Sequence, residues 1–349
     1  MKKIGIFLTN YSLMLYILWN RDWKETCYLL YNYFGNMDED FFQRLDVCGV
    51  KNVYGREYSC MGIYQPSVKN IPRRILRKIY YIYDKNFRLH SVIKVAREKK
   101  IEVYGQDHLP ISKFFHYGKF NVIEDGLMNY RSRQDLYEYF TKNPIWCANF
   151  SADYVPGGWD NSIQKVYLTG RLAVPKGLQK KAVIQPLSES WEKIPSNEKK
   201  EILYLFDVPL QDLNEIAHSG RNVFFLSSGF VPQFCTEEEW IRICKKMLSP
   251  YDLKHVVIKL HPGEPIDYKK YFPECHILQA NFPFEFVYFL QVPIKKVVSV
   301  RSTALYGFLD SEQIDDYPQY DELMNNRIER KRKNEDNVIK KLRYFWNKI

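Results

Sequence analysis

Short apolar runs alternate with longer segments of helical periodicity along the first half of this 349-residue chain. Apolar runs with the length of buried strands occur at 4–8, 27–31, 50–54, 101–104 and 120–123. Apolar side chains recur at helical spacing between these runs, over residues 12–20, 38–46 and 72–99. Strands that alternate with helices in this way predict an α/β fold, with a parallel sheet covered by helices on both faces.

The second half of the chain repeats the same order of elements. Strands are predicted at 166–169, 222–226, 255–260, 276–278 and 296–300. Thr236, with Glu239 three residues later, forms a capping box and predicts a helix that ends near Leu248.

The length of the chain predicts two domains, since one hydrophobic core rarely extends beyond roughly 250–300 residues. The polar segment 181–200, which contains Pro186 and Pro195, is the best candidate for a linker between them. We therefore predict three parts: an N-terminal domain over 1–190, a C-terminal domain over 191–318 and a basic C-terminal helix over 319–349.

The N-terminus resembles a signal peptide, with two lysines ahead of an apolar run, but Thr9, Asn10 and Ser12 interrupt the run. It is better explained as a buried first strand, and no apolar run reaches the roughly 18 residues of a transmembrane helix. The seven cysteines include no C-x-x-C pair, which argues against a disulfide framework and a zinc site. These features predict a cytoplasmic protein, soluble or peripheral on the inner face of the cell membrane.

The net charge of +10 is concentrated in two segments. Residues 69–100 contain eleven Lys or Arg against two acids, and the basic tail 327–349 ends in three aromatic residues close together, Tyr344, Phe345 and Trp346. Basic helices with interfacial aromatics predict contact with an anionic membrane surface, although solvated helix faces explain the same charges. No nucleic-acid recognition motif accompanies them, so nucleic acid is not a predicted partner.

Residues suited to an anionic ligand follow two predicted strands of the second half. Lys259, His261 and Pro262 lie at the end of one strand, and Ser302 and Thr303 follow another at the start of a predicted helix. Ligands of open parallel sheets bind outside the carboxyl ends of the strands, and a helix N-terminus adds N–H groups and partial positive charge. The pattern indicates a nucleotide-phosphate site, while a core histidine and simple helix capping are the structural alternatives.

Three further residues fit the same ligand. Ser228 and Gly229 form a small-residue loop after the strand 222–226, which allows a ligand to approach closely. Glu285 can accept hydrogen bonds from ribose hydroxyls, although an acid that follows Pro283 is also typical of a helix start.

Two pairs of acids stand in the first half. Glu124 and Asp125 end a buried strand ahead of Gly126, and they form either a general base with shifted pKa values or an ordinary Asp-Gly turn. Asp38 and Asp40 have the D-x-D spacing of a nucleotide-bound metal site, but their place before an aromatic-apolar run favours a helix cap. We therefore predict no metal site.

Three motifs of this chain resemble, in matching order, the acidic-acidic-Gly, His-Pro and Ser/Thr motifs of bacterial sialyltransferases: Glu124-Asp125-Gly126, His261-Pro262 and Ser302-Thr303. The closest similarity is to glycosyltransferase family 52, which includes lipooligosaccharide and capsular polysaccharide sialyltransferases, through the spacing of Tyr167–Gly170, Lys259–Pro262 and Pro283–Glu285. The resemblance covers about residues 120–310. It implies a GT-B fold, in which two Rossmann-like domains face a central cleft and the C-terminal one holds the nucleotide.

The resemblance also implies an inverting transfer of sialic acid from CMP-sialic acid to a terminal sugar such as galactose, with no metal and no cofactor. Asp125, beside Glu124, would then be the base for the acceptor hydroxyl, and His261 would assist the departure of CMP. Glu285 would hold the ribose or the base of CMP, and Ser302 with Thr303 its phosphate. A histidine of pKa about 6.5 matches the second pKa of a phosphate monoester, near about 6, and either protonates the leaving phosphate or hydrogen-bonds to it.

The loop after Leu226 departs from the family pattern, because Ser227-Ser228-Gly229 stands where Gln-Pro followed by acids is expected. If this loop supplies the base in close relatives, Glu237, Glu238 and Glu239 are the nearest substitutes for Asp125. Two other functions stay open, a GT-B transferase that uses another nucleotide sugar and a noncatalytic protein that binds membranes or polymers. The sequence leaves the acceptor, the linkage, the sialic acid variant and a homodimeric state open.

Overall fold

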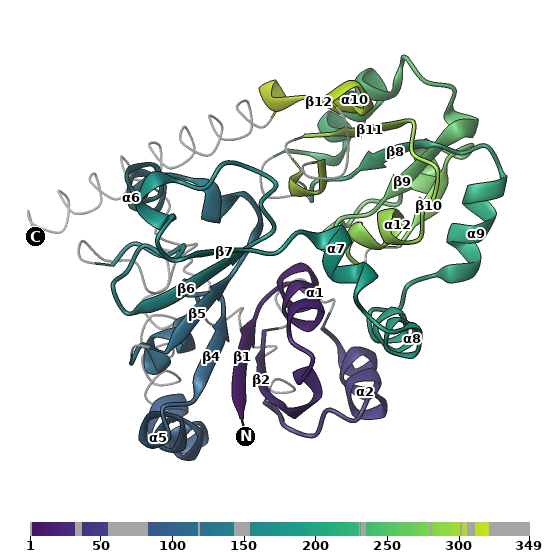
Figure 1. The fold of residues 1–349 in the computed structure, drawn as a ribbon. Coiled ribbons are helices and arrows are strands. Elements are labelled where there is room, and N and C mark those ends of the chain that lie inside the picture. Colours follow the sequence, from purple (N-terminus) through teal and green to yellow (C-terminus); the bar gives the residue numbers. More distant parts are fainter. Residues whose placement is uncertain are drawn as a thin grey trace, which may run out of the picture. The chain divides into compact units, whose positions relative to one another are not determined.

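Two parallel β-sheets, each in its own compact unit, form the cores of this protein (Figure 1). The N-terminal unit comprises Met1–Val208 and Asn281–Phe289, and the C-terminal unit comprises Pro209–Ala280 and Leu290–Ile349. The computed structural model describes residues 2–31, 37–54, 83–117, 119–142, 154–229, 231, 235–279, 281–300, 302–305 and 311–320. Much of the two predicted basic segments, residues 69–82 and 321–349, lies outside these ranges.

The sheet of the N-terminal unit has seven parallel strands in the order β3-β2-β1-β4-β5-β6-β7. The strands are β1 (Lys3–Phe7), β2 (Thr26–Leu30), β3 (Val53–Tyr54), β4 (Glu102–Gly105), β5 (Phe120–Ile123), β6 (Ile163–Leu168) and β7 (Ala182–Ile184). All except β7 overlap predicted strands, so the α/β prediction is confirmed for this half. The central strands read as continuous apolar runs because a parallel sheet is covered on both faces.

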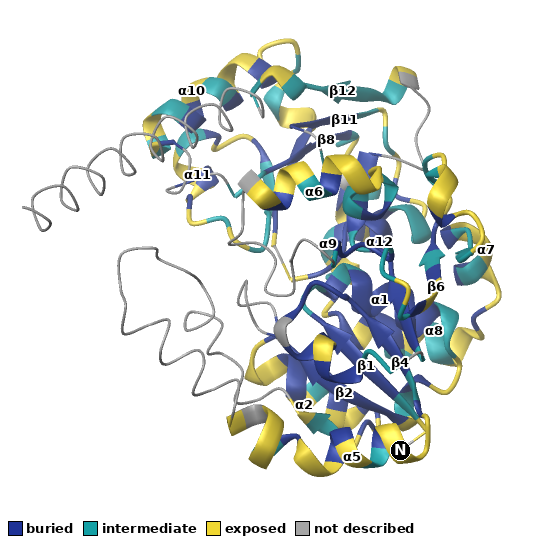
Figure 2. Cartoon of the chain, turned by 90° about the vertical axis from the view of Figure 1, so that its left-hand side faces the viewer, coloured by how far each residue is buried: buried dark blue, intermediate teal, exposed yellow. Residues whose placement is uncertain are grey.

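The helices of this unit are α1 (Asn10–Trp19), α2 (Glu39–Val47), α5 (His90–Glu98), α6 (Arg133–Lys142), α7 (Leu187–Glu192), α8 (Ser196–Leu205) and α12 (Glu285–Phe289). Short stretches of π- or 3-10 helix lie at Trp23–Glu25, Asp84–Arg88, Pro110–Phe115, Gly126–Tyr130 and Lys176–Leu178. Helix α1 is buried along most of its length, whereas one side of α5 is polar and exposed to solvent (Figure 2).

The prediction of a linker over residues 181–200 is wrong, because this segment contains β7, α7 and the start of α8. Pro186 and Pro195 are not linker prolines; each stands directly before a helix, where the missing N–H of proline needs no partner. Trp191 of α7 stacks on Phe289 of α12, with ring centroids 4.8 Å apart. The first stretch of the N-terminal unit therefore continues to Val208, beyond the predicted boundary at residue 190.

The sheet of the C-terminal unit has five parallel strands in the order β10-β9-β8-β11-β12. They are β8 (Val223–Leu226), β9 (Val256–Lys259), β10 (His276–Leu278), β11 (Lys296–Ser299) and β12 (Ile314–Asp316), with helices α9 (Leu210–His218), α10 (Glu237–Leu248) and α11 (Tyr268–Tyr271). Single 3-10 turns lie at Leu253–His255, Thr303–Leu305 and Ser311–Gln313. The capping box of Thr236 and Glu239 is confirmed at the start of α10.

Each sheet reverses its strand order once, between β1 and β4 in the N-terminal unit and between β8 and β11 in the C-terminal unit. Such switch points are where open α/β sheets bind ligands, outside the carboxyl ends of the strands. The loops that follow β1, β4, β8 and β11 are therefore the first places to look for a site. Within the described ranges, every helix is too short or too polar to cross a membrane.

Candidate functional site

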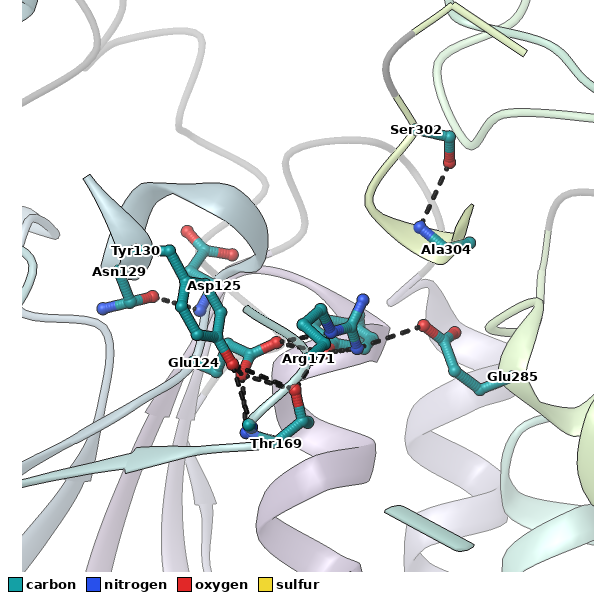
Figure 3. Close-up of polar contacts among 11 residues, drawn as sticks. Glu124, Asp125, Asn129, Tyr130, Thr169, Arg171, Glu285, Ser302 and Ala304 are labelled. Carbon is teal, nitrogen blue, oxygen red and sulfur yellow. Dashed lines mark hydrogen bonds and ion pairs between the residues drawn. The ribbon is translucent and has the colours of Figure 1, made fainter. Parts of the chain in front are cut away.

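Glu124 follows β5 and is the centre of a buried polar cluster in the N-terminal unit (Figure 3). Its Oε1 accepts a hydrogen bond from the Tyr11 hydroxyl at 2.7 Å, and its Oε2 accepts from the Tyr130 hydroxyl at 2.7 Å. The backbone N–H and the hydroxyl of Thr169 also donate to Oε2, at 2.7 and 2.8 Å. With its side chain fully buried and both oxygens occupied, Glu124 is suited to holding loops in place rather than to taking up a proton.

Arg171 joins this cluster to helix α12, as Figure 3 shows. Its Nε lies 3.1 Å from Glu124, and one terminal nitrogen lies 3.8 Å from Glu285 and donates to the Tyr11 hydroxyl. The guanidinium also lies over the Tyr11 ring, 5.1 Å from its centroid. Both carboxylates thus share a cation that is almost fully buried, which compensates the burial of their charge.

Glu285 was predicted to bind the nucleotide with the residues of the C-terminal half, yet it belongs to the N-terminal unit. Its segment is fastened there by Arg171 and by Asn10, whose Nδ2 donates to the Asn281 carbonyl at 2.8 Å. The prediction assigned Glu285 to the C-terminal domain because of its position along the chain. That position does not show that the segment Asn281–Phe289 belongs to the N-terminal unit.

Asp125 stands next to this cluster and has a different environment. Its side chain is about one-fifth exposed, 3.8 Å from Nε2 of His108, and Oδ1 accepts from the Ser12 hydroxyl at 3.4 Å. Burial raises the pKa of Asp125, while the charge of His108 and hydrogen bonds from Gln106 and Ser12 oppose that rise. A carboxylate that is partly exposed and has a raised pKa is suited to accept a proton near neutral pH.

His108 and Gln106 were missed by the sequence analysis, although both follow β4 directly at the switch point. Gln106 accepts from the Leu8 N–H at 2.7 Å and donates to the Ser12 hydroxyl at 3.1 Å, so it links the ends of β1 and β4. The preceding Gly105 has a φ of +145°, and a Cβ there would lie 2.0 Å from the Ile6 carbonyl oxygen. The sequence signal that could have identified Gln106 and His108 is a glycine, Gly105, at the end of a strand, followed by polar residues.

The second group of predicted residues lies at the carboxyl ends of β8 and β9 in the C-terminal unit. His261 and Pro262 begin a turn closed by the Glu264 N–H, which donates to the His261 carbonyl at 2.9 Å. The backbone N–H of Gly263 donates to Nδ1 of His261 at 3.0 Å, so the proton of the neutral ring is on Nε2. Burial, reinforced by the charge of Lys259, lowers the pKa of His261 to about 4. At neutral pH this ring is therefore a neutral hydrogen-bond donor.

The small-residue loop after β8 packs against this histidine. The Ser227 hydroxyl accepts from the His261 N–H at 2.8 Å. Gly229 has a φ of +57°, and a Cβ there would lie 2.6 Å from Nδ1 of His261. Glu264, which the sequence analysis did not single out, interacts with both Ser227 and the backbone of Gly229 and so ties the two loops together. Ser228 lies between them and is half-buried.

Lys259 and Ser302 complete the second group. Lys259 ends β9 and is buried, with its ammonium 3.2 Å from the Leu260 carbonyl. Ser302 follows β11, donates its N–H to the Ser299 hydroxyl at 3.2 Å and accepts from the Ala304 N–H at 3.4 Å. Thr303 begins a 3-10 turn, Thr303–Leu305, at the place where the sequence predicted the start of a helix, and the next residues, 306–310, lie outside the described ranges.

Three of the other candidate acids, Glu237, Glu239 and Asp38, have structural partners. Glu239 accepts from the Thr236 N–H at 3.1 Å, and Glu237 accepts from the Tyr271 hydroxyl at 2.5 Å. Asp38 caps α2 by accepting from the Phe41 N–H at 3.0 Å, as the helix-cap interpretation predicts. In the part of the chain that the structure describes, no three His, Cys, Asp or Glu side chains come together as a metal site.

Comparison with known proteins adds a family and a fold. The model of glycosyltransferase family 52 matches residues 72–316. An uncharacterized protein of Haemophilus influenzae is 28% identical over 274 residues, which cover 74% of this chain and 86% of that protein.

Two solved structures share the fold. The GT-B domain of a sialyltransferase from Photobacterium damselae has a TM-score of 0.50 at 11% identity. The match covers 89% of this chain and 89% of that one. A 2,6-sialyltransferase from Photobacterium sp. JT-ISH-224, solved with CMP and lactose, has a TM-score of 0.52 at 10% identity, over 90% of this chain and 70% of that one. These similarities confirm the predicted GT-B fold, and at such identities they extend to the fold alone.

Proposed function

Since the chain belongs to glycosyltransferase family 52, we propose that it transfers sialic acid from CMP-sialic acid to a hydroxyl of a terminal sugar. Galactose at the end of a bacterial lipooligosaccharide or capsular polysaccharide is the proposed acceptor. The anomeric configuration inverts, because the acceptor oxygen attacks the face opposite to the departing CMP. No metal ion and no further cofactor take part.

The observation that carries this proposal is the environment of His261. A neutral histidine with its proton on Nε2 stands beside Lys259 at the carboxyl edge of the C-terminal sheet. When sialic acid leaves, the single phosphate of CMP gains a negative charge. A fixed donor and a cation bind that charge more strongly in the transition state than in the ground state, which is the condition for catalysis.

The proposed base is Asp125, and its partners support this role. Sialic acid transfers through an oxocarbenium-like state, so the acceptor hydroxyl needs only to be oriented and deprotonated as it attacks. The carboxylate of Asp125 is held by Ser12 and faces His108, which can stabilise it in the charged form. Glu124 and Arg171 serve as positioning residues, because their contacts fix the loops after β5 and β6.

A direct test is to incubate the protein with CMP-sialic acid and a panel of galactosides and to analyse the products by mass spectrometry. We expect one sialic acid to be added, with release of CMP. Transfer from a UDP- or GDP-sugar, or from another CMP-linked keto sugar, would show that the donor is not CMP-sialic acid, although the protein would still be a glycosyltransferase. An absence of CMP release under all conditions would favour the noncatalytic membrane- or polymer-binding protein.

Activity is expected to persist in excess EDTA, because the leaving group carries one phosphate and Asp38 serves as a helix cap. Asp38→Ala should cost about 1 kcal/mol of stability, as lost N-caps do, and should leave the transfer rate nearly unchanged. Rates measured with and without chelator test this. Loss of activity in EDTA that magnesium or manganese restores would contradict it and point to a diphosphate donor.

Gly229→Ala is expected to slow transfer and donor hydrolysis by up to about 10²-fold, since the new Cβ would displace the His261 ring. Gly220→Ala is a matched control. Gly220 also has a positive φ, +76°, but a Cβ added there would have Nδ1 of His255 as its nearest atom, at 3.8 Å. Both variants should lose similar stability through backbone strain, and equal activities of the two variants would contradict the positioning role of Gly229.

A further inference from the structure

Glu264 lies in a chain of hydrogen bonds that begins in the core of the C-terminal unit. The indole N–H of Trp240, on α10, donates to the hydroxyl of Tyr268, on α11, at 2.7 Å. The Tyr268 hydroxyl donates in turn to Oε2 of Glu264 at 2.9 Å. Trp240 and Tyr268 are almost completely buried, so close packing fixes the geometry at this end of the chain.

The other end of the chain is the backbone of His261. The Ser227 hydroxyl is hydrogen-bonded to Glu264 and accepts from the His261 N–H at 2.8 Å. An indole N–H and a backbone N–H can only donate. The hydroxyls of Tyr268 and Ser227 therefore accept from Trp240 and from His261, and each directs its own proton to Glu264.

Two backbone N–H groups are further partners of this carboxylate. Ile266 donates to Oε1 of Glu264 at 3.4 Å, and the backbone of Gly229 also hydrogen-bonds to the carboxylate. The two hydroxyls and the two N–H groups are all donors. A protonated carboxyl would have to place its own proton against one of them, so the arrangement requires the charged carboxylate.

We propose that Glu264 is a positioning residue for the departure of CMP, an inference that rests on the proposed function. Its carboxylate holds the loop after β8 against the His261 turn, through Ser227, and it does so only while it is charged. The same carboxylate holds Gly229, where an added Cβ would lie 2.6 Å from Nδ1 of His261. Loss of the charge should therefore displace the His261 ring from the place where it donates to the phosphate.

The pH dependence of donor hydrolysis separates this role from a merely structural one. Burial raises the pKa of Glu264, while hydrogen bonds from Tyr268 and Ser227 oppose that rise. The titratable groups on which the charge of Glu264 acts are Tyr268 and Cys244 of α10, and burial raises the pKa of both, so both stay neutral in the assay. His261, with a pKa of about 4, titrates at lower pH. Hydrolysis by the parent should therefore fall as the pH drops through the raised pKa of Glu264.

Glu264→Gln keeps the shape of the side chain and removes its charge. At neutral pH it should slow transfer and donor hydrolysis alike by up to about 10²-fold, after correction for hydrolysis without protein, and the acid limb of hydrolysis should disappear. Ser227→Ala should have a similar effect on the rates. The double variant should lose no more than the larger single loss, because the two side chains act through one network. Additive losses, or an acid limb that Glu264→Gln retains, would overturn the proposal.

Asp315→Asn is the matched control. Asp315 also accepts from a tyrosine hydroxyl, that of Tyr251, and burial raises its pKa. It lies on β12, which β8 and β11 separate from β9. The rates and the acid limb should be those of the parent in this variant, and thermal unfolding should show that all variants are folded. Equal rate losses in Asp315→Asn and Glu264→Gln would contradict a positioning role.

Hydrogen exchange over residues 227–229 and 260–264, measured by mass spectrometry, tests the contact without any reaction. These segments should exchange faster in Glu264→Gln than in the parent, and at the rate of the parent in Asp315→Asn. Unchanged exchange in Glu264→Gln would overturn the inference whether or not the protein transfers sialic acid. Absence of CMP release by the parent would instead contradict the proposed function.

Discussion

Replacing Asp125 with asparagine is expected to lower the transfer rate by roughly 10²–10⁴-fold and to leave CMP binding nearly unchanged. The amide cannot take the proton of the acceptor hydroxyl. The residues proposed to bind CMP phosphate are on the C-terminal unit, whereas Asp125 belongs to the N-terminal unit. Initial rates of transfer, rates of donor hydrolysis and calorimetric CMP binding separate these effects. Donor hydrolysis should be nearly retained, because it does not use the acceptor.

The stability of this variant provides an independent readout. Burial raises the pKa of Asp125 above its value in the unfolded chain, so the charged carboxylate destabilises the folded state at neutral pH. Asp125→Asn should therefore unfold at a higher temperature than the parent at pH 7 to 8. The difference should shrink as the pH falls through the raised pKa of Asp125, where the parent carboxyl is itself neutral.

Asp107 is the matched control, since it is a fully buried aspartate two residues beyond Gly105 with a structural role. Its two oxygens accept from the N–H groups of Gly157 and Gly158, each at 2.9 Å. Asp107→Asn should lose stability by roughly 1–3 kcal/mol, because one N–H group then faces an amide instead of an acceptor. If Asp125→Asn kept full transfer activity, the base would have to be another acid, with Glu238 the most exposed candidate at the start of α10.

Most strands of both sheets were predictable from the sequence because they are short apolar runs between polar segments. Strands β7 and β12 were not predicted, because each is a three-residue edge strand that is only partly buried and has no such run. The segment 181–200 was misinterpreted for a related reason. Its helices are short and polar, and each begins after a proline, so the local composition resembled that of a linker. The buried side chain of Trp191, which packs α7 into the unit, was not recognised.

The site was only partly predictable. The residues at the end of a strand can be identified from the sequence, but the side chains that other strands bring into contact with them cannot. Asp125 and His261 were identified as residues that end buried strands. Arg171 was not among the predicted site residues, since nothing local shows that it is buried between Glu124 and Glu285. His108 was missed for the same reason, as its partner Asp125 is brought to it by the pairing of β4 with β5.

The protonation state of His261 likewise depends on the fold. An unperturbed histidine has a pKa of about 6.5 and is equally able to protonate a phosphate or to hydrogen-bond to it. The burial of the ring and the nearby Lys259 remove this ambiguity, because they lower the pKa of His261 to about 4. The structure therefore favours hydrogen bonding over proton donation.

Replacing His261 with alanine is expected to slow both transfer and donor hydrolysis by roughly 10²–10³-fold, the usual loss when one donor to a developing oxyanion is removed. Both reactions require CMP to leave, so both should fall together, in contrast to Asp125→Asn. His261→Gln should recover part of the rate, since its amide can donate a hydrogen bond.

The pH dependence of kcat/KM decides how the His261 ring acts. Because kcat/KM reports the pKa values of the free enzyme, a ring with a pKa of about 4 should produce no alkaline limb between about pH 6 and 8. The rate should instead fall toward acid pH, as Asp125 becomes protonated and can no longer accept a proton. An alkaline limb in the parent that His261→Gln abolishes would show that the ring donates its proton. A loss of transfer with unchanged donor hydrolysis would remove His261 from the leaving-group side of the reaction.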